Sequence, residues 1–242
     1  MSEWFKDWFN TKYYHLLYKD RDLDEARTFI SNLLFHLELP SQSKVLDLAC
    51  GSGRHAIQLA ENNLIVSGID ISEKSIEEAK RKAGDLVDFR VHDMRQNVGE
   101  NYYDAVFNLF TSFGYFEDQK DDIRVIQAVK KSLKQNGLFI IDYLNSKYVE
   151  DNLVAHETKK CDSISFTIDK QILNGFVVKE IRFNDGQEEY TFKEKVKLFT
   201  KEQLESLLRQ EGFEVISVFG DYQLNPFKEN ESERLIIISK LK

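Results

Sequence analysis

The sequence predicts an α/β fold with a doubly wound, mostly parallel sheet of seven strands. The first observation is the alternation of strand-like and helix-like stretches from residue 44 to residue 144. The second is a small-residue turn with two glycines directly after the first strand, and the third is an acidic residue at the end of each of the next two strands. Alternation of this kind makes each helix a crossover between parallel strands, with helices on both faces of the sheet.

The composition indicates a globular protein with a large core and excludes several classes of partner. Of the 242 residues, 42% are hydrophobic and 31% are charged, and the net charge is −8. This acidic balance disfavours a broad phosphate-binding surface, so we expect no nucleic-acid partner. No apolar run approaches the roughly 18 residues that cross a bilayer, and the start of the chain does not resemble a signal peptide. We therefore expect a cytoplasmic protein without a membrane partner.

Cysteine and histidine usage predicts neither a disulfide framework nor a metal site. The two cysteines, Cys50 and Cys161, are too few for a ligand cluster, and the five histidines show no metal-ligand spacing. Cys50 lies in the small-residue turn, where we interpret it as a space-filling residue.

Residues 1–39 are expected to form a helical segment rich in aromatic side chains. Aromatic pairs recur four residues apart, at Trp4 and Trp8 and again at Tyr14 and Tyr18. A helix this aromatic has to bury one face against the domain or a partner. The stretch LPSQS (39–43) ends this pattern.

The alternating region then follows in order. Its predicted strands and helices are strand 44–48, helix 53–62, strand 64–70, helix 72–83, strand 86–93, strand 102–110, helix 121–137 and strand 137–144. Ser72 is the expected N-cap of its helix. The helix from residue 121 has acids at its start, lysines at its end and Gly137 after it.

The pattern changes after about residue 155 to strands without intervening helices. Strands are expected at 163–169, 176–183 and 190–199, joined by turns at Asn174-Gly175 and Asp185-Gly186. This predicts an antiparallel β insertion. A helix with a capping box of Thr200 and Gln203 follows, and strands at 213–220 and 234–240 close the fold.

The turn VLDLACGSGRHA (45–56) and the acids behind it indicate a nucleoside-binding edge. Gly51 and Gly53 permit positive φ and a close approach of a ligand to the backbone. In a doubly wound sheet, ligands bind outside the carboxyl ends of the strands, where a carboxylate such as Asp70 can accept both hydroxyls of a ribose. Asp93 and Met94 end the third strand at the same edge.

The glycines alone do not decide between a dinucleotide cofactor and a cofactor with an ammonium or sulfonium group. Residues 51–56 match G-x-G-x-x-A, a permitted form of the dinucleotide fingerprint, so a nucleotide-linked (NAD) oxidoreductase remains an alternative. Asp47 disfavours it, because a carboxylate inside the strand suits an ammonium or sulfonium better than a phosphate.

At these motifs the sequence resembles the class I S-adenosylmethionine-dependent methyltransferases. The resemblance rests on VLDLACGSGRH, GIDIS, HDM and YDAV and covers roughly residues 40–145, with 213–240 fitting the same fold. It implies a seven-stranded sheet with one antiparallel strand near its edge and S-adenosylmethionine as cofactor. Ala49 stands where the family usually has its first glycine, which places a methyl group near the cofactor.

The resemblance also implies roles for single residues. Ala49 and Gly51 would contact the methionine part, Asp70 the ribose hydroxyls and Ile71 the adenine. Asp93 would accept from the adenine amino group, Met94 would donate from its backbone, and the Asn108 carbonyl would contact the amino-acid end. The complete expected set of cofactor-binding residues is Tyr14, Asp47, Ala49, Gly51, Arg54, Asp70, Ile71, Asp93, Met94 and Asn108.

The sequence thus predicts a methyltransferase that acts on a small molecule, in one domain spanning 1–242. Residues 1–39 are expected to form a lid with Tyr14 over the cofactor, 40–145 the cofactor-binding core, 146–199 the acceptor side and 200–242 the closing helix and strands. No catalytic residue is selected, since an amine acceptor needs no dedicated base; for a hydroxyl acceptor, His15, His55 or Asp142 are candidates. A non-catalytic S-adenosylmethionine-binding module is the third alternative.

Overall fold

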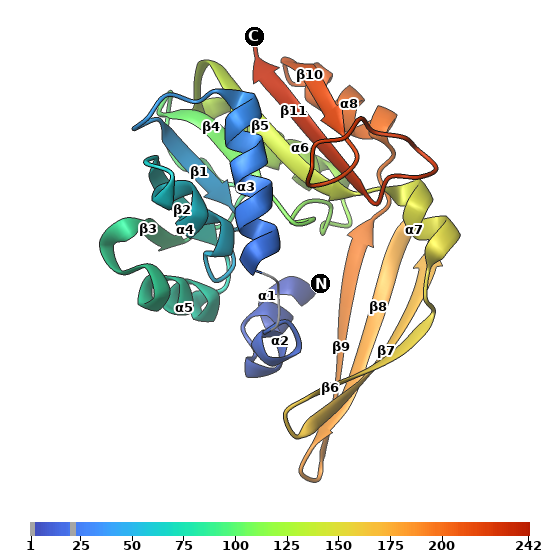
Figure 1. The fold of residues 1–242 in the computed structure, drawn as a ribbon. Helices are drawn as coiled ribbons and strands as arrows, with labels where there is room; N and C mark the ends of the chain where they lie inside the picture. Colours follow the sequence, from blue (N-terminus) through green and yellow to red (C-terminus); the bar gives the residue numbers. More distant parts are fainter. Residues whose placement is uncertain (1–2, 20–22) are drawn as a thin grey trace.

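The computed structural model describes residues 3–19 and 23–242 and contains two β-sheets (Figure 1). In spatial order, the larger sheet consists of β10 (Phe213–Phe219), β11 (Arg234–Leu241), β5 (Leu133–Leu144), β4 (Tyr103–Asn108), β1 (Lys44–Leu48), β2 (Ile65–Asp70) and β3 (Asp88–Val91). β1 pairs in parallel with both β2 and β4, while β11 runs antiparallel to β5 and β10. The predicted seven-stranded, mostly parallel sheet with an antiparallel strand near one edge is confirmed.

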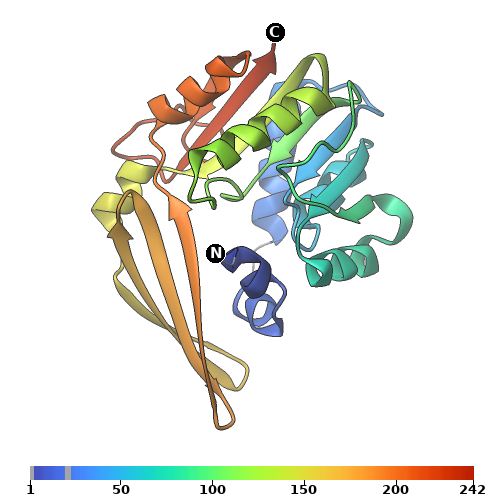
Figure 2. The same cartoon turned by 180° about the vertical axis from the view of Figure 1, so that it is seen from behind.

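Helices cover both faces of this sheet, as the doubly wound prediction requires. One core cluster joins the sheet to α3 (Leu23–Leu37), α4 (Arg54–Glu61) and α5 (Glu73–Ala83), and the other joins it to α6 (Gln119–Ser132) and α8 (Lys201–Gln210). Figure 2 shows α6 and α8 on the face opposite to α3. Within the described ranges, no helix combines the length and the apolar character that a membrane span needs.

Local capping chemistry sets the starts of two predicted helices. The Ser72 hydroxyl accepts from the Ser75 backbone N–H at the start of α5, and Thr200 and Gln203 form the complete capping box of α8. The end of one predicted helix is wrong: a helix was expected over 121–137, but α6 ends at Ser132. Leu133 is fully buried and pairs with β4, so packing of the sheet outweighs the helical periodicity of this stretch.

The smaller sheet is antiparallel and contains β6 (His156–Cys161), β7 (Ile164–Leu173), β8 (Phe176–Asp185) and β9 (Glu188–Lys197). The Asn174-Gly175 turn between β7 and β8 has the expected positive φ angles of 51° and 76°. The sequence did not predict β6, whose charged residues mask its pairing with β7, nor α7 (Ser146–Asn152).

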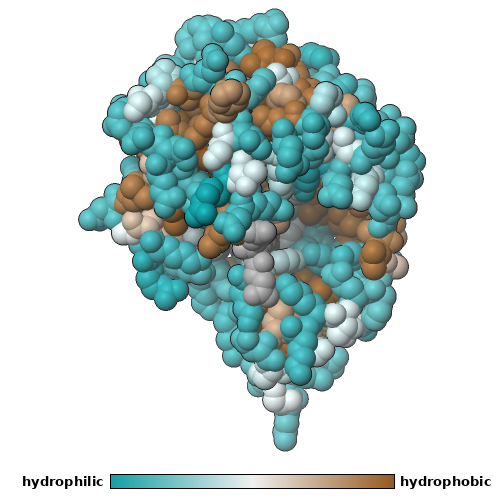
Figure 3. All heavy atoms as spheres, viewed as in Figure 1, coloured by the Kyte–Doolittle hydropathy of each residue, from teal (hydrophilic) through white to brown (hydrophobic). Residues whose placement is uncertain are grey.

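Two short N-terminal helices, α1 (Trp4–Phe9) and α2 (Lys12–Leu17), lie between the two sheets (Figures 1 and 2). Trp8 is fully buried and donates from Nε1 to Glu194 of β9 at 2.8 Å. On the other side, the Ser72 hydroxyl donates to the Phe9 carbonyl at 2.9 Å. The aromatic face predicted for this segment is therefore buried against both parts of the chain, and the surface is hollowed beside it (Figure 3).

Candidate functional site

Three adjoining cavities lie at the carboxyl ends of the parallel strands. We name them the β3-side cavity, the loop cavity (about 270 Å³) and the sheet-side cavity (about 280 Å³). The β3-side cavity is lined by Phe5, Phe9, Ala49, Asp70, Ile71, His92, Asp93, Met94, Tyr115 and Phe116. Residues 49–52 and 54 line the loop cavity, and the sheet-side cavity lies against β8 and β9. Phe9 and Tyr115 line all three, so the cavities adjoin at these two side chains.

The turn between β1 and α4 has a left-handed backbone at three positions. Ala49, Gly51 and Gly53 have φ angles of 61°, 54° and 80°. A Cβ at Gly53 would lie 2.6 Å from the Phe89 ring, whereas a Cβ at Gly51 would meet no atom within 4 Å. Gly53 is therefore required for packing, and Gly51 borders open space in the loop cavity. Ala49 adopts a left-handed conformation that is usually found for glycine, so its backbone is strained. The sequence did not reveal this strain.

Asp70 lies between the β3-side cavity and the loop cavity and lines both. One carboxylate oxygen accepts from the Gly51 backbone N–H and the other from the Ser72 N–H, each at 2.8 Å. These two bonds hold the carboxylate at the end of β2.

Asp47 is a buried carboxylate beneath the same turn, with 1% of its surface exposed. Its Oδ2 atom accepts no hydrogen bond from the described residues. Burial raises the pKa of Asp47 to about 7; the neighbouring Asp70 charge adds to this, while the Ala56 N–H and Arg54 oppose it. An unsatisfied buried carboxylate of this kind suits a ligand cation.

Asn108 ends β4 beside Asp47 and is also fully buried. Its amide nitrogen donates to the Leu48 carbonyl at 3.0 Å and thereby ties β4 to β1. Its Oδ1 atom is without a hydrogen-bond donor in residues 3–19 and 23–242. The ends of β1 and β4 therefore hold two unsatisfied acceptors.

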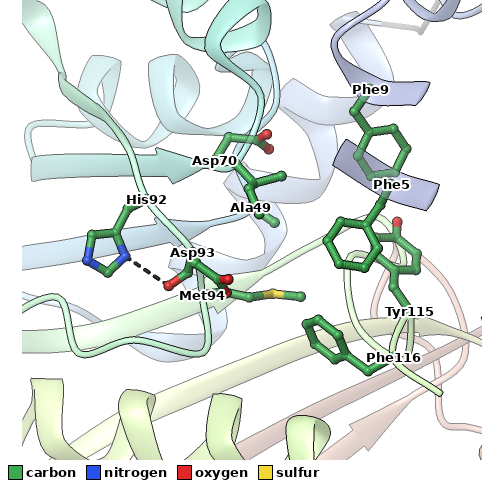
Figure 4. Close-up of a pocket in the computed structure, with 10 residues that line it drawn as sticks. Phe5, Phe9, Ala49, Asp70, His92, Asp93, Met94, Tyr115 and Phe116 are labelled. Carbon is green, nitrogen blue, oxygen red and sulfur yellow. Dashed lines mark hydrogen bonds between the residues drawn. The ribbon is translucent and has the colours of Figure 1, made fainter. Parts of the chain in front are cut away.

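The β3-side cavity combines apolar walls with an ion-paired acid (Figure 4). Ile71, Met94 and the Phe5 and Phe9 rings line it together with Asp93. Burial opposes ionisation of Asp93, but the hydrogen bonds from Arg95 outweigh it and hold the pKa of Asp93 below its usual range. Arg95 also pairs with Glu3 at 2.6 Å, a contact from the N-terminal segment that the sequence gave no reason to expect.

Tyr14 lines the loop cavity and the sheet-side cavity, as expected for a residue near the cofactor. Its ring packs on Phe9 and Tyr18, with centroids 4.8 Å and 5.0 Å away. Tyr13 points elsewhere and donates to Asp185 at 2.9 Å. Arg54 lines the loop cavity and lies over the Phe110 ring at 4.6 Å.

The candidate bases occupy different environments. His15 and His55 line the loop cavity, and His15 lies 3.2 Å from a Glu78 oxygen. Asp142 is completely buried and accepts from Arg234, so its carboxylate is engaged within the fold. Burial raises the pKa of the Cys50 thiol well above its usual range, which fits a space-filling and unreactive cysteine.

The sheet-side cavity includes residues from 146–199, the range expected on the acceptor side, but apart from Tyr14 the sequence did not predict its individual residues. Its lining comes from the N-terminal segment, the loop after β4, the end of β5, the smaller sheet and the start of β11: Trp4, Phe9, Tyr14, Tyr18, Phe110, Thr111, Tyr115, Leu144, Val177, Lys179, Glu194, Val196 and Arg234. Among its polar groups, Glu194 accepts from Tyr18 at 2.7 Å and pairs with Lys179 at 2.9 Å. No local motif marks the single positions; the available signals were the aromatic residues before residue 20 and the change to an antiparallel pattern after about residue 155.

The residues at the loop and β3-side cavities fit S-adenosylmethionine. The unsatisfied Asp47 and Asn108 oxygens suit its ammonium, the open space at Gly51 admits its methionine part, and Asp70 faces the space between both cavities. Aromatic rings around the loop cavity suit the sulfonium. A pyrophosphate in the place of the ammonium would instead be repelled by an ionised Asp47.

Comparison with known proteins agrees with this chemistry. A family model described as "Methyltransferase domain" matches residues 39–216. YqeM of Bacillus subtilis (strain 168), which is named as a candidate methyltransferase, is 29% identical over 210 residues, covering 81% of this chain and 83% of the relative. A glycine/sarcosine N-methyltransferase of Aphanothece halophytica is 26% identical over 229 residues, covering 91% of this chain and 83% of the relative.

A solved structure supports the fold. The crystal structure of an S-adenosylmethionine-dependent methyltransferase from Clostridium acetobutylicum ATCC 824 superposes with a TM-score of 0.79 at 22% identity, covering 95% of this chain and 96% of that chain. Since the family model spans most of the chain and the motif residues meet in one site, the protein belongs to the methyltransferase domain family and is an S-adenosylmethionine-dependent methyltransferase.

Proposed function

We propose that the protein transfers a methyl group to a small-molecule acceptor that binds in the sheet-side cavity. The observation that carries this proposal is the junction of the two cavities. The loop cavity and the sheet-side cavity share Phe9, Tyr14, Tyr18, Phe110 and Tyr115. An acceptor in one cavity would therefore meet a cofactor in the other across an aromatic constriction.

The geometry of the site supports the following cofactor roles. Asp70 binds the ribose hydroxyls, and Ile71 and Met94 enclose the adenine next to Asp93. Asp47 and Asn108 bind the ammonium, while Ala49, Gly51 and Arg54 border the methionine part. When bound, S-adenosylmethionine supplies an electrophilic methyl group on a sulfonium, and the chain has to align the acceptor and exclude water.

The N-terminal helices α1 and α2 act as a lid in this proposal, with Tyr14 as its contact to the cofactor. They lie between the two sheets and provide Phe9, Tyr14 and Tyr18 to the junction. Residues 40–145 then form the cofactor-binding core, 146–199 the acceptor side and 200–242 the closing part of one domain.

An amine is the acceptor group that the site favours. Amine methylation requires alignment and desolvation rather than a strong base, and Asp142 is engaged inside the fold. The relative that methylates glycine and sarcosine supports this choice.

Calorimetry and thermal unfolding with S-adenosylhomocysteine, NAD and NADP test the cofactor assignment. At about 100 times its dissociation constant, S-adenosylhomocysteine should stabilise the fold by roughly 2.7 kcal/mol, and the two dinucleotides should leave the melting temperature unchanged. Stabilisation by NAD alone would contradict it. Release of S-adenosylhomocysteine from S-adenosylmethionine with a panel of small amines then tests the acceptor, and turnover with none of them contradicts the amine assignment.

A further inference from the structure

The side chain of Arg234, at the start of β11, is fixed at the edge of the sheet-side cavity by Asp142 and Thr111. Its Nε atom donates to Oδ1 of Asp142 at 2.8 Å, and its Nη2 atom lies 2.7 Å from the same oxygen. Nη2 also donates to the Thr111 hydroxyl at 2.9 Å. Asp142 has no exposed surface, so this carboxylate is a rigid support for the guanidinium.

The Arg234 guanidinium has hydrogen-bond donors that the described residues do not use. Its hydrogen bonds to the described residues come from Nε and Nη2, which leaves the two N–H groups of Nη1 without an acceptor in that part of the chain. The side chain is 19% exposed and lines the sheet-side cavity. A guanidinium that is buried, fixed and incompletely satisfied is suited to an anionic ligand oxygen.

The backbone that supports this arrangement is strained. Phe110 and Thr111 follow each other with φ angles of 60° and 59°, and neither is glycine. Asp142 hydrogen-bonds to the backbone of both residues. Its side-chain Oδ2 atom accepts from the Phe110 N–H, and its backbone carbonyl accepts from the Thr111 N–H. A left-handed β-branched residue is a rare outlier, and strain of this kind concentrates at ligand-binding sites. Here it brings the Thr111 hydroxyl to Arg234.

Charge distribution selects the side of Arg234 on which an anion would bind. In the sheet-side lining, Lys179 pairs with Glu194, the one carboxylate among the described lining residues. Arg234 pairs with the buried Asp142, so this side presents no unpaired carboxylate to an anion. Arg234 also borders an open cavity of about 910 Å³, where the lining acids Glu25, Asp221, Glu231 and Glu233 outnumber the cations. Those carboxylates would repel an anion on the open side.

We propose that Arg234 recognises an anionic oxygen group, a carboxylate or a phosphate, on the methyl acceptor, with Asp142 and Thr111 as its positioning residues. The acceptor is then an amine that also has an anionic group. Its anionic end lies at Arg234, and its amine points to the aromatic junction with the loop cavity. This assignment rests on the proposed function and names its substrate class.

The test compares pairs of ligands that differ in one charge. Calorimetry on the S-adenosylhomocysteine-saturated protein uses glycine against glycinamide, β-alanine against its amide, and O-phosphoethanolamine against ethanolamine. In at least one pair the anionic member should bind about tenfold more tightly or better, equivalent to 1.4 kcal/mol. A preference in the phosphate pair alone assigns the group as a phosphate. Equal affinity within every pair, including no binding of either member, overturns the inference.

Variants then assign the preference to Arg234. Arg234→Met should remove the difference within the pair, Arg234→Lys should retain part of it, and Thr111→Val should reduce it several-fold. Lys228→Met removes a cation from the open cavity and serves as the matched control, with the preference intact. S-adenosylhomocysteine affinity should stay unchanged in all four. If Arg234→Met folds and still shows the full preference for the anionic ligand, the inference is overturned. If that variant does not fold, the full preference in both Arg234→Lys and Thr111→Val overturns it.

Methyl transfer to the same ligands separates this inference from the proposed function. Binding that depends on Arg234 without any methylated product contradicts the proposed amine acceptor and leaves the anion site in place. Equal turnover of the acids and their amides supports the proposed function and overturns the anion site.

Discussion

The carboxylate of Asp70 accepts a hydrogen bond from the backbone N–H of Gly51 at 2.8 Å, so the residue that ends β2 also fixes the turn that follows β1. These two positions are neighbours because β1 and β2 pair in parallel. Asp70, the expected contact to the ribose, is thus hydrogen-bonded to Gly51, the expected contact to the methionine part of the cofactor.

Replacing Asp70 should weaken cofactor binding more than it weakens the fold. Asp70→Ala removes charge-assisted hydrogen bonds worth about 1.5–3 kcal/mol, equivalent to roughly 10- to 150-fold in affinity for S-adenosylhomocysteine. Asp70→Asn keeps an acceptor for the Gly51 N–H and should lose less. Calorimetry measures the affinities, and an Asp70→Ala protein that is folded and binds normally would exclude this residue from the site.

Ala49→Gly should stabilise the fold, because Ala49 has a φ of 61°. The left-handed conformation costs a residue with a Cβ roughly 1–2 kcal/mol, which exceeds the entropic cost of a new glycine, about 0.5–1 kcal/mol. Chemical denaturation should show a higher midpoint with an unchanged slope. Asn174→Gly, which relieves a left-handed residue in the distant β7–β8 turn, is the comparison, and it should leave cofactor affinity unchanged. A lower midpoint for Ala49→Gly would show that the methyl group contributes packing that outweighs the strain.

Gly51→Val should abolish cofactor binding, because the side chain would enter the open space at this turn and oppose a φ of 54°. Gly175→Val imposes comparable backbone strain in the β7–β8 turn, outside the loop and β3-side cavities that would hold the cofactor, at a φ of 76° and again with open space around the position. Both variants should lose stability, but the Gly175 variant should retain cofactor affinity in calorimetry. Normal binding by folded Gly51→Val would mean that the loop is only a turn.

Cofactor binding should become tighter as the pH rises toward 7. The pKa of Asp47 is raised to about 7 in the folded protein, above its value in the unfolded chain. The folded state therefore holds the proton more tightly, and the unliganded protein loses stability as the pH rises from about 4 to about 7. A cofactor ammonium favours the ionised form, so binding releases this proton.

The Asp47→Asn variant isolates this effect. Affinity of the wild type for S-adenosylhomocysteine should rise by up to about tenfold per pH unit below 7 and level off above it. The asparagine variant should show a flatter profile, because it has no carboxylate to ionise at this position. Calorimetry in buffers of different ionisation enthalpy counts the released proton, and identical pH profiles would contradict the role of Asp47.

The N-terminal helices should open when their contact with the smaller sheet is weakened. Glu194 accepts from Trp8 and Tyr18 and pairs with Lys179. Glu194→Gln removes the charge that organises these contacts and should speed amide hydrogen exchange in residues 4–17. Glu180→Gln, whose carboxylate pairs with Lys193 of β9 instead of the N-terminal helices, is the matched control.

Hydrogen exchange also distinguishes a lid from a fixed structural flank. A lid is poorly protected in the unliganded protein and gains protection when S-adenosylhomocysteine binds. Equal protection of α1 and α2 in both states would assign them a purely structural role.

The features that the sequence determined are local ones. The glycine turn after β1, the acids that end the next strands, the Ser72 N-cap and the capping box of α8 each depend on residues a few positions apart, so their chemistry is visible in the chain itself. Hydrophobic periodicity predicted the elements of the larger sheet for the same reason. It failed at Leu133, where pairing with β4 outweighed helical spacing, and at β6, whose alternation is masked by charged residues.

Tertiary structure decided what local spacing cannot encode. The sheet-side cavity combines residues as distant as Tyr18, Thr111, Glu194 and Arg234, and no pattern in the sequence links them. The strain at Ala49 is likewise invisible in the sequence, because an alanine adopts a left-handed backbone when the surrounding strands and helix leave the chain no other path. The cofactor motifs are local because they are built on one turn and the adjacent strand ends, whereas the acceptor cavity exists only after the N-terminal helices and the smaller sheet pack against the strand ends of the larger sheet.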